Sequence, residues 1–321
     1  MKKHLKTMRD AFIERLSSLM ELDDTIMFLT ADLGAPSLDV LRAKFPKKFL
    51  NVGIAEQNLV NLASGLALEG YKVFAYGIAS FLVMRAYEQI RNNVSMLSQF
   101  HDLNINLMGL GAGLSYNIGG PTHQSLEDIV LMMTLPNIMT FSPSDSNIVR
   151  SLVDYCLDIP KPKYFRLDGH PLPNIYSTVD RNDISRGFKE LVTGEDICLV
   201  STGFMTHVAL EVSKALGDSG IKAGVLDIYL LKPFNEDGVG KILKRYNIVI
   251  TLEEAFINKG GLDCTLLRLI YRLNPRIRFL NLGYHDNYLF EIGTRDFLHK
   301  KMGLAVDDLI SVIQQLYRSQ Q

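Results

Sequence analysis

The order of structural elements is clearest around the stretch Asn51-Val52-Gly53-Ile54-Ala55-Glu56-Gln57-Asn58 of this 321-residue chain. A short apolar run, residues 49–52, comes before the turn at Gly53, and a segment of helical character continues to about Glu69. This pattern predicts a strand, a turn and a helix. Glu56 would then lie in the first helical turn, where the helix macrodipole favours a carboxylate by roughly 0.3–1 kcal/mol. Taken alone, this position indicates only a helix-start charge.

Strands and helices are expected to alternate on both sides of this stretch. Continuous apolar runs are typical of strands in a parallel sheet that is buried on both faces. We predict strands at 26–30, 49–52, 73–76, 103–110, 137–141 and 163–166, and helices at 4–20, 56–69, 80–96, 125–133 and 148–156. Strict alternation of this kind indicates an α/β fold with a parallel sheet.

A second set of elements follows a linker-like segment, residues 167–185, that is rich in Pro, Asp, Asn and Ser. Strands are expected at 197–201, 223–228, 248–252 and 278–281, and helices at 207–216, 237–245, 261–273 and 306–317. The sequence therefore predicts two α/β domains, residues 1–185 and 186–321, the second one smaller.

The composition narrows the classes of function. The chain has 34 Lys and Arg against 35 Asp and Glu, so its charge gives no reason to expect a nucleic-acid partner. The three cysteines are far apart and show no spacing typical of zinc or disulfides. The uncharged run at 103–124 holds five glycines and three asparagines, which suits a strand and loop better than a membrane span. With no signal-like N-terminus, we expect a cytoplasmic protein with no membrane segment and no metal site of its own.

Two later segments indicate a different role for Glu56. An aromatic-rich segment at 81–89 contains Phe81-Leu82 and Arg85-Ala86-Tyr87-Glu88-Gln89, and Gly120-Pro121-Thr122-His123-Gln124 follows a glycine-rich loop. This ordered set resembles the pyrimidine-binding half of the transketolase family, which uses thiamine diphosphate. The resemblance continues into the second half, at Leu231-Lys232-Pro233-Phe234, Leu252-Glu253-Glu254 and Gly260-Gly261-Leu262.

The resemblance implies roles for individual residues. Glu56 matches the family's glutamate that hydrogen-bonds the aminopyrimidine ring and activates the cofactor, a task that needs a dry site. The aromatic that stacks on the pyrimidine is Phe81 by one count along the motif and Leu82 by another, and Phe81 is preferred because it is aromatic. His123 is expected to face the substrate and to exchange protons with it. Arg85 is a further substrate-binding candidate, and Asp32-Leu33 matches a pair near the cofactor.

One family signature is missing. The chain contains no Gly-Asp-Gly followed some 25–30 residues later by Asn-Asn, the motif that holds Mg²⁺ and the diphosphate in this family. The resemblance therefore implies the C-terminal subunit of a split transketolase. An N-terminal subunit would carry most of the Mg²⁺ and diphosphate site, and two copies of each chain would form an α2β2 assembly.

Three departures concern the substrate. Gly111, Gly119 and Gly169 stand where the family's sugar-phosphate enzymes have a His, an Asp and a phosphate-binding Arg. Either an atypical sugar is the substrate, or other residues take over; the candidates are a partner residue and Arg85, Arg166, His170, Tyr116 or Asn117. Two other functions stay open. One is a decarboxylating relative, similar to deoxyxylulose-phosphate synthase or to a 2-oxo acid dehydrogenase β-subunit. The other is a non-catalytic interaction subunit.

Overall fold

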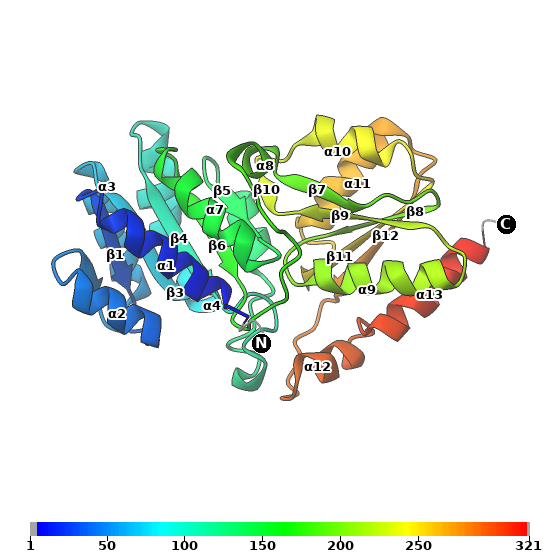
Figure 1. Cartoon of the computed structure of the whole chain (residues 1–321), viewed down its shortest axis with the longest axis horizontal. Helices are drawn as coiled ribbons and strands as arrows, with labels where there is room; N and C mark the ends of the chain where they lie inside the picture. The colour runs from blue at the N-terminus through cyan, green and yellow to red at the C-terminus, as the bar shows by residue number, and fades with distance from the viewer. Residues whose placement is uncertain (1–4, 320–321) are drawn as a thin grey trace.

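The computed structural model describes residues 5–319 as two α/β units, each built on its own sheet (Figure 1). The first sheet has seven strands in the order β10-β5-β6-β4-β3-β1-β2, and only β10 is antiparallel to its neighbour. The strands are β1 (Ile26–Thr30), β2 (Phe49–Asn51), β3 (Lys72–Ile78), β4 (Ile105–Leu110), β5 (Met139–Phe141), β6 (Lys163–Leu167) and β10 (Leu230–Lys232). The predicted α/β class is confirmed.

Helices cover both faces of this sheet. One core lies under α1 (Met8–Met20), α2 (Pro36–Lys44), α7 (Ser146–Leu157) and α8 (Arg181–Arg186). The opposite core lies under α3 (Glu56–Leu68), α4 (Ala79–Arg85) and α6 (Asp128–Thr134). The prediction of one continuous helix at 80–96 is wrong in part. This stretch is divided into α4, α5 (Tyr87–Gln89) and a π-helical segment, Ile90–Met96, because the backbone of Ala86 (φ −100°, ψ 18°) interrupts the regular helix.

The second sheet has five strands in the order β12-β11-β8-β9-β7. They are β7 (Phe188–Val192), β8 (Ile197–Ser201), β9 (Ala223–Ile228), β11 (Ile248–Phe256) and β12 (Arg278–Tyr284), all parallel except β7. Its two cores are covered by α9 (Met205–Asp218), α12 (Arg295–Lys301) and α13 (Val306–Arg318) on one side, and by α10 (Glu236–Leu243) and α11 (Leu262–Leu273) on the other.

Five α-helices and strands were not expected from the sequence: α2, β7, β10, α8 and α12. The prediction of a linker at 167–185 is wrong at its C-terminal end, where the chain forms the helix α8. Asp180 and Asp183 form a reciprocal capping box at the start of this helix, and Gly187 ends it with a φ of +82°. The short strand β10 carries the chain back from the second half to pair with β5. The predicted helix start at residue 4 lies outside the described residues, and α1 begins at Met8 with Thr7 as its cap.

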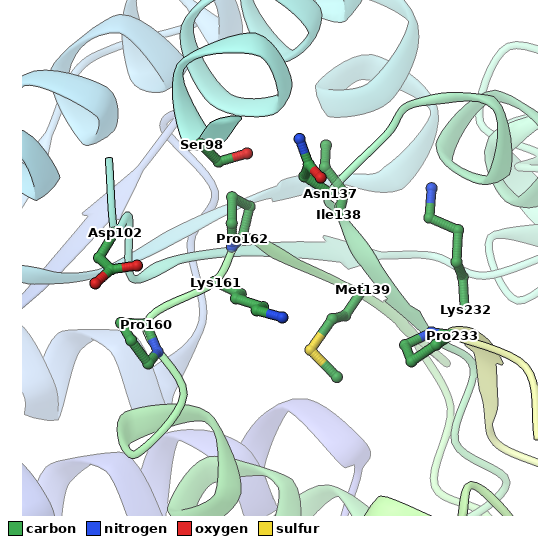
Figure 2. Close-up of a pocket in the computed structure, with 10 residues that line it drawn as sticks. All are labelled: Ser98, Asp102, Asn137, Ile138, Met139, Pro160, Lys161, Pro162, Lys232 and Pro233. Carbon is green, nitrogen blue, oxygen red and sulfur yellow. The ribbon is translucent and has the colours of Figure 1, made fainter. Parts of the chain in front are cut away.

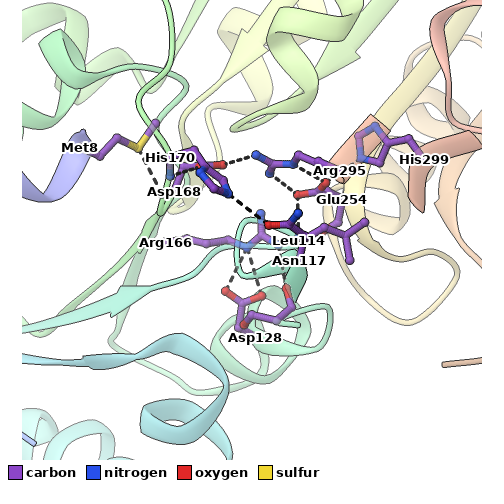
Figure 3. A network of polar contacts seen from close by, with 11 residues as sticks. Met8, Leu114, Asn117, Asp128, Arg166, Asp168, His170, Glu254, Arg295 and His299 are labelled. Carbon is purple, nitrogen blue, oxygen red and sulfur yellow. Dashed lines mark hydrogen bonds and ion pairs between the residues drawn. The ribbon is translucent and has the colours of Figure 1, made fainter. Parts of the chain in front are cut away.

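Two buried arginines join the two units (Figure 3). Arg295 of α12 donates to both carboxylate oxygens of Glu254, at 2.9 and 2.5 Å, and to Asp168 at 2.7 Å. Arg166 of β6 is ion-paired with Asp128 and also donates to the backbone oxygen of Glu254 at 2.7 Å. These charges are almost fully buried, so each needs its partners to compensate for the solvation that it loses on burial.

The glycine-rich loop after β4 packs against the same carboxylate. A Cβ atom on Gly113 would lie 1.9 Å from Oε2 of Glu254, and the φ of Gly113 is +54°. Both facts require glycine here. The glycine at this position therefore allows a close approach between the two units.

Candidate functional site

The carboxyl ends of the parallel strands form the edge where open α/β sheets bind ligands. The chain passes from β1 to β2 on one side and then to β3 on the other, so the strand order reverses between β1 and β3. Every candidate follows a carboxyl end at this edge: Asp32 follows β1, Glu56 follows β2, Phe81 follows β3 and His123 follows β4. Connectivity thus places the predicted residues on one edge of one sheet.

Glu56 is held at the start of α3 by the turn before it. The backbone N–H of Gly53 donates to Oδ1 of Asn51 at 3.0 Å, and Gly53 has a φ of +76°, which favours glycine. Glu56 is only 3 % exposed, although its side chain ends in a carboxyl group. Nη1 of Arg85, at the end of α4, donates to Oε2 of Glu56 at 2.6 Å. The carboxylate therefore lies in a dry position with one charged partner.

Phe81 links this pair to His123. The guanidinium carbon of Arg85 lies 5.2 Å from the centroid of the Phe81 ring. The imidazole ring of His123 meets the same ring edge-on, with centroids 5.1 Å apart and an angle of 68° between planes. Leu82 instead is 0 % exposed and packs into the core beneath α3 and α4. Glu56, Arg85, Phe81 and His123 thus form one connected group, which we call the edge cluster, and Leu82 lies outside it.

The backbone around His123 is held from both units. Ser80, at the start of α4, donates to the carbonyl oxygen of Thr122 at 3.2 Å, and Oγ1 of Thr122 lies 3.1 Å from Nδ1 of His123. From the second unit, the carbonyl oxygen of Leu289 accepts from Gln124 at 3.2 Å. Sequence reasoning missed Ser80 as a support. A serine that follows an expected strand and opens an expected helix is the sequence signal that could have indicated it, and the structure shows that it is buried.

Asp32 and Leu33 are placed beside the edge cluster but are not connected to it. Asp32 has a φ of +52° and accepts a 2.9 Å hydrogen bond from Nδ2 of Asn51, so it is tied to the turn that leads to Glu56. The hollow at Asp32, Leu33 and Asn51 measures about 90 Å³. Small-molecule pockets usually measure roughly 300–1,000 Å³, so this hollow alone is too small for a cofactor.

The residues considered as replacements for the three absent side chains have different surroundings. Arg166 is 3 % exposed, and its bonds to Asp128, Ser125 and Glu254 use it within the protein. The hypothesis that Arg166 contacts the substrate is therefore not supported. Nε2 of the exposed His170 lies 3.2 Å from Oδ1 of Asn117, at the carboxyl edge (Figure 3).

A larger cavity, of about 310 Å³, contains none of the edge-cluster residues in its lining. Figure 2 shows the residues that line it. Its lining includes Lys161, Pro162 and Met139, which stand at the amino ends of β6 and β5. Lys232, also in the lining, donates to main-chain carbonyls at the end of α6, and burial lowers its pKa to about 8. Because the amino ends of parallel strands are opposite to the ligand-binding edge, this cavity is not part of the candidate site.

The edge cluster fits one half of a cofactor site. A dry carboxylate can accept a hydrogen bond from a heterocyclic N–H, a half-buried aromatic ring can pack against a flat heterocycle, and the imidazole beside it can exchange a proton. Ile54, next to this group, leaves 77 % of its surface exposed. The fold and the cluster define an α/β protein with a pyrimidine-binding type of domain followed by a second, smaller α/β unit.

Comparison with known families identifies this class more closely. The family described as "Transketolase, pyrimidine binding domain" matches residues 5–173, and "Transketolase, C-terminal domain" matches residues 188–309. The first match alone spans more than half of the chain. The chain therefore belongs to the transketolase family, and the resemblance found in the motifs is confirmed.

Individual relatives are subunits of enzymes in this family. A subunit of the apulose-4-phosphate transketolase of Actinobacillus succinogenes is 32 % identical over 269 residues, covering 84 % of this chain and 85 % of the relative. The 6-deoxy-6-sulfo-D-fructose transketolase subunit SqwH of Clostridium sp. is 29 % identical over 304 residues, covering 94 % and 92 %. A solved structure described as "Split gene transketolase, inactive beta4 tetramer" superposes with a TM-score of 0.84 at 32 % identity, covering 96 % of this chain and 97 % of that one.

Two features are absent within residues 5–319. None of the helices there combines the length and apolar character that crossing a membrane requires. No group of three or more His, Cys, Asp or Glu side chains in the same range is arranged to hold a metal ion.

Proposed function

We propose that this chain is the C-terminal subunit of a heteromeric, thiamine-diphosphate-dependent transketolase that transfers a two-carbon ketol unit between sugars. The edge cluster carries the proposal, because it joins a dry carboxylate, an aromatic ring and an imidazole at the ligand-binding edge. The family match and the subunit relatives support it. The domain division at residues 185 and 186 belongs to the same proposal. It falls within α8, and every strand except β10 lies in the sheet on its own side of the division.

Each residue of the cluster receives a role under this proposal. The Glu56 carboxyl hydrogen-bonds the pyrimidine ring and takes part in its protonation, and Arg85 positions that carboxyl and borders the substrate. Phe81 packs on the pyrimidine in preference to Leu82, because the Leu82 side chain is used in the core. His123 faces the substrate and exchanges a proton with its hydroxyl or carbonyl oxygen. Asp32 and Leu33 border the cofactor from the side of β1. The bound cofactor supplies the reactive carbon.

A partner subunit completes the site in this proposal. It would contribute the Mg²⁺ and the diphosphate contacts in an α2β2 assembly in the cytoplasm. The exposed apolar residues around the cluster support a partner here, because a soluble surface rarely gathers them without an interface. They include Ile54, Ile118, Phe290 and Ile292, which are 77 %, 78 %, 74 % and 63 % exposed.

The proposed substrate is a sugar other than the common ketose phosphates. Gly119 supports this, because a Cβ atom there would lie 2.7 Å from Cβ and Cγ of His123, so the position has no room for a side chain while His123 is in place. The two relatives named for apulose 4-phosphate and 6-deoxy-6-sulfo-D-fructose also support an atypical sugar.

The test is ketol transfer by the complex of this chain with its partner, thiamine diphosphate and Mg²⁺. Glu56→Gln should lower kcat by about 10²–10⁴-fold, the usual contribution of a general acid or base. Glu236→Gln is the matched control, because Glu236 is also a first-turn glutamate but lies in the second unit. Equal turnover by wild type and Glu56→Gln would refute the catalytic role. Carbon dioxide release from pyruvate without ketol transfer would favour a decarboxylating enzyme instead.

A further inference from the structure

The space at the carboxyl ends of β4 and β6 is filled by one tyrosine. These strands are neighbours, with Leu110 paired to Leu167, and Gly111 and Gly169 follow soon after their ends. A Cβ atom on Gly111 would lie 2.6 Å from Cδ2 of Tyr116, and one on Gly169 would lie 3.1 Å from Cε1. Opposite edges of the Tyr116 ring therefore face the two glycines.

Backbone geometry fixes this arrangement. Gly111 has a φ of +96°, so a side chain at that position would be strained whatever space surrounds it. The backbone N–H of Gly119 donates to the carbonyl oxygen of Tyr116 at 3.0 Å, and Asn117 donates to the carbonyl oxygen of Gly293 at 2.6 Å. The loop that carries Tyr116 is thus held by the second unit. Through Gly119 it also lies directly against the ring of His123.

Tyr116 offers a neutral polar group at this place. Its side chain is half-buried. Burial raises the pKa of the phenol, and the nearby Arg9 charge opposes that rise only in part. The hydroxyl therefore stays protonated at neutral pH. The hydroxyl lies close enough to Arg9 for the two groups to interact, and the ring packs against the core under α1.

We propose that Tyr116 is the specificity-determining residue of this site. It closes the space above Gly111 and Gly169, so the enzyme selects sugars whose distal end does not extend into that space, such as unphosphorylated, deoxy or branched ends, and disfavours a terminal phosphate that would need it. This inference rests on the proposed ketol transfer. A ring that fills a pocket discriminates by shape, and a single methylene can change kcat/KM by roughly 10–200-fold.

The experiment compares two ketose donors, xylulose 5-phosphate and erythrulose, with the complete complex and one common acceptor. The readout is the ratio of kcat/KM for the phosphorylated donor to that for the unphosphorylated donor. Tyr116→Ala should raise this ratio by at least ~10-fold, since it opens the space. Tyr116→Phe should change it less, because the ring remains. Tyr71→Ala is the matched control: this exposed tyrosine precedes β3, at the opposite edge, and should leave the ratio unchanged.

A second test acts on the ring from the other side. A methyl group added by Gly169→Ala would press on Cε1 of Tyr116, so the ratio should change by about threefold or more, the low end of coupling between touching residues. The same substitution in the Tyr116→Ala background should have no effect on the ratio. If Tyr116→Ala does not fold, Gly169→Ala in the wild-type background and Tyr116→Phe decide the question.

The outcomes separate the two proposals. A wild-type complex that transfers ketol units, with ratios within twofold in Tyr116→Ala, Tyr116→Phe and Gly169→Ala, overturns the role of Tyr116 alone. A wild-type complex that transfers no ketol unit from any donor overturns the proposed function, and the Tyr116 role with it. A shifted ratio in Tyr116→Ala with an unchanged ratio in Tyr71→Ala supports both.

Discussion

Arg85 donates a 2.6 Å hydrogen bond from Nη1 to Oε2 of Glu56, and its guanidinium lies 5.2 Å from the centroid of the Phe81 ring. The two side chains come from helices that follow β2 and β3, on opposite sides of β1 in the sheet. Their pairing brings a buried carboxylate and a half-exposed cation together at the ligand edge. One cation therefore orients the carboxylate and also meets the aromatic ring.

This relationship predicts the effect of removing the cation. Arg85→Ala should lower kcat/KM of the reconstituted complex about 10–100-fold, since a hydrogen bond to a charged group is worth roughly 1.5–3 kcal/mol. Arg85→Lys should recover part of the loss, because an ammonium group restores the charge but not the planar contact with Phe81. Steady-state kinetics measures both. The exposed Arg91 serves as the control, and a loss in Arg91→Ala as large as in Arg85→Ala would contradict a specific role.

The junction between the units predicts a large loss of stability. Arg295→Ala leaves Glu254 and Asp168 buried without their cation, which should lower the free energy of unfolding by about 3–5 kcal/mol. The exposed pair of Arg245 and Glu190 gives the comparison, because a surface ion pair contributes only about 0–1 kcal/mol. Urea unfolding of Arg295→Ala and Arg245→Ala measures the difference. Equal losses would show that the buried pairs do not hold the units together.

A buried glutamate predicts a pH dependence of stability. Burial, with Asp263 nearby, raises the pKa of Glu253 to about 8 from a usual 4.5. The folded state therefore keeps a proton that the unfolded state releases between pH 4.5 and 8. The contribution of Glu253 to stability is fully present below pH 4.5 and is lost as the pH rises through 8.

Glu253→Gln removes this titration, so the free energy of unfolding of the variant minus that of the wild type should increase between pH 5 and pH 8. Urea unfolding at both values measures it, with Glu236→Gln as the control because that side chain is partly exposed at the surface. A difference between Glu253→Gln and wild type that is constant with pH would contradict a raised pKa for Glu253.

The sequence could predict the parts of the fold and site that local patterns determine. Apolar strand runs and strict alternation determine the parallel sheet, and the connectivity then brings Glu56, Phe81 and His123 to one edge. The short strand β10 could not be predicted, because its position depends on pairing with β5, about 90 residues earlier. For the same reason the burial of Arg166 was missed, since its partner Glu254 lies in the other unit.

The role of the glycines also needed tertiary contacts. The sequence showed that these positions lack side chains. It could not show that the Tyr116 ring lies between Gly111 and Gly169, because that position depends on how the loop after β4 folds over the edge. A similar limit applied to Phe81 and Leu82. Adjacent residues on a helix point in different directions, and only packing shows that Leu82 faces the core and Phe81 faces His123.

The open edge around Glu56 predicts that the isolated chain binds its cofactor poorly. The hollow at Asp32 is about 90 Å³, and no set of acidic side chains arranged for a metal is found within residues 5–319. A Mg²⁺ ion that bridges phosphates needs carboxylate and carbonyl ligands already in place. Calorimetry of the purified chain with thiamine diphosphate and Mg²⁺ should therefore show a Kd weaker than about 1 mM, which corresponds to roughly −4 kcal/mol.

The complex with the N-terminal subunit should bind at least ~100-fold more tightly, and Glu56→Gln in that complex should weaken binding because the carboxylate contact is lost. Tight, Mg²⁺-dependent binding by the isolated chain would refute the shared site.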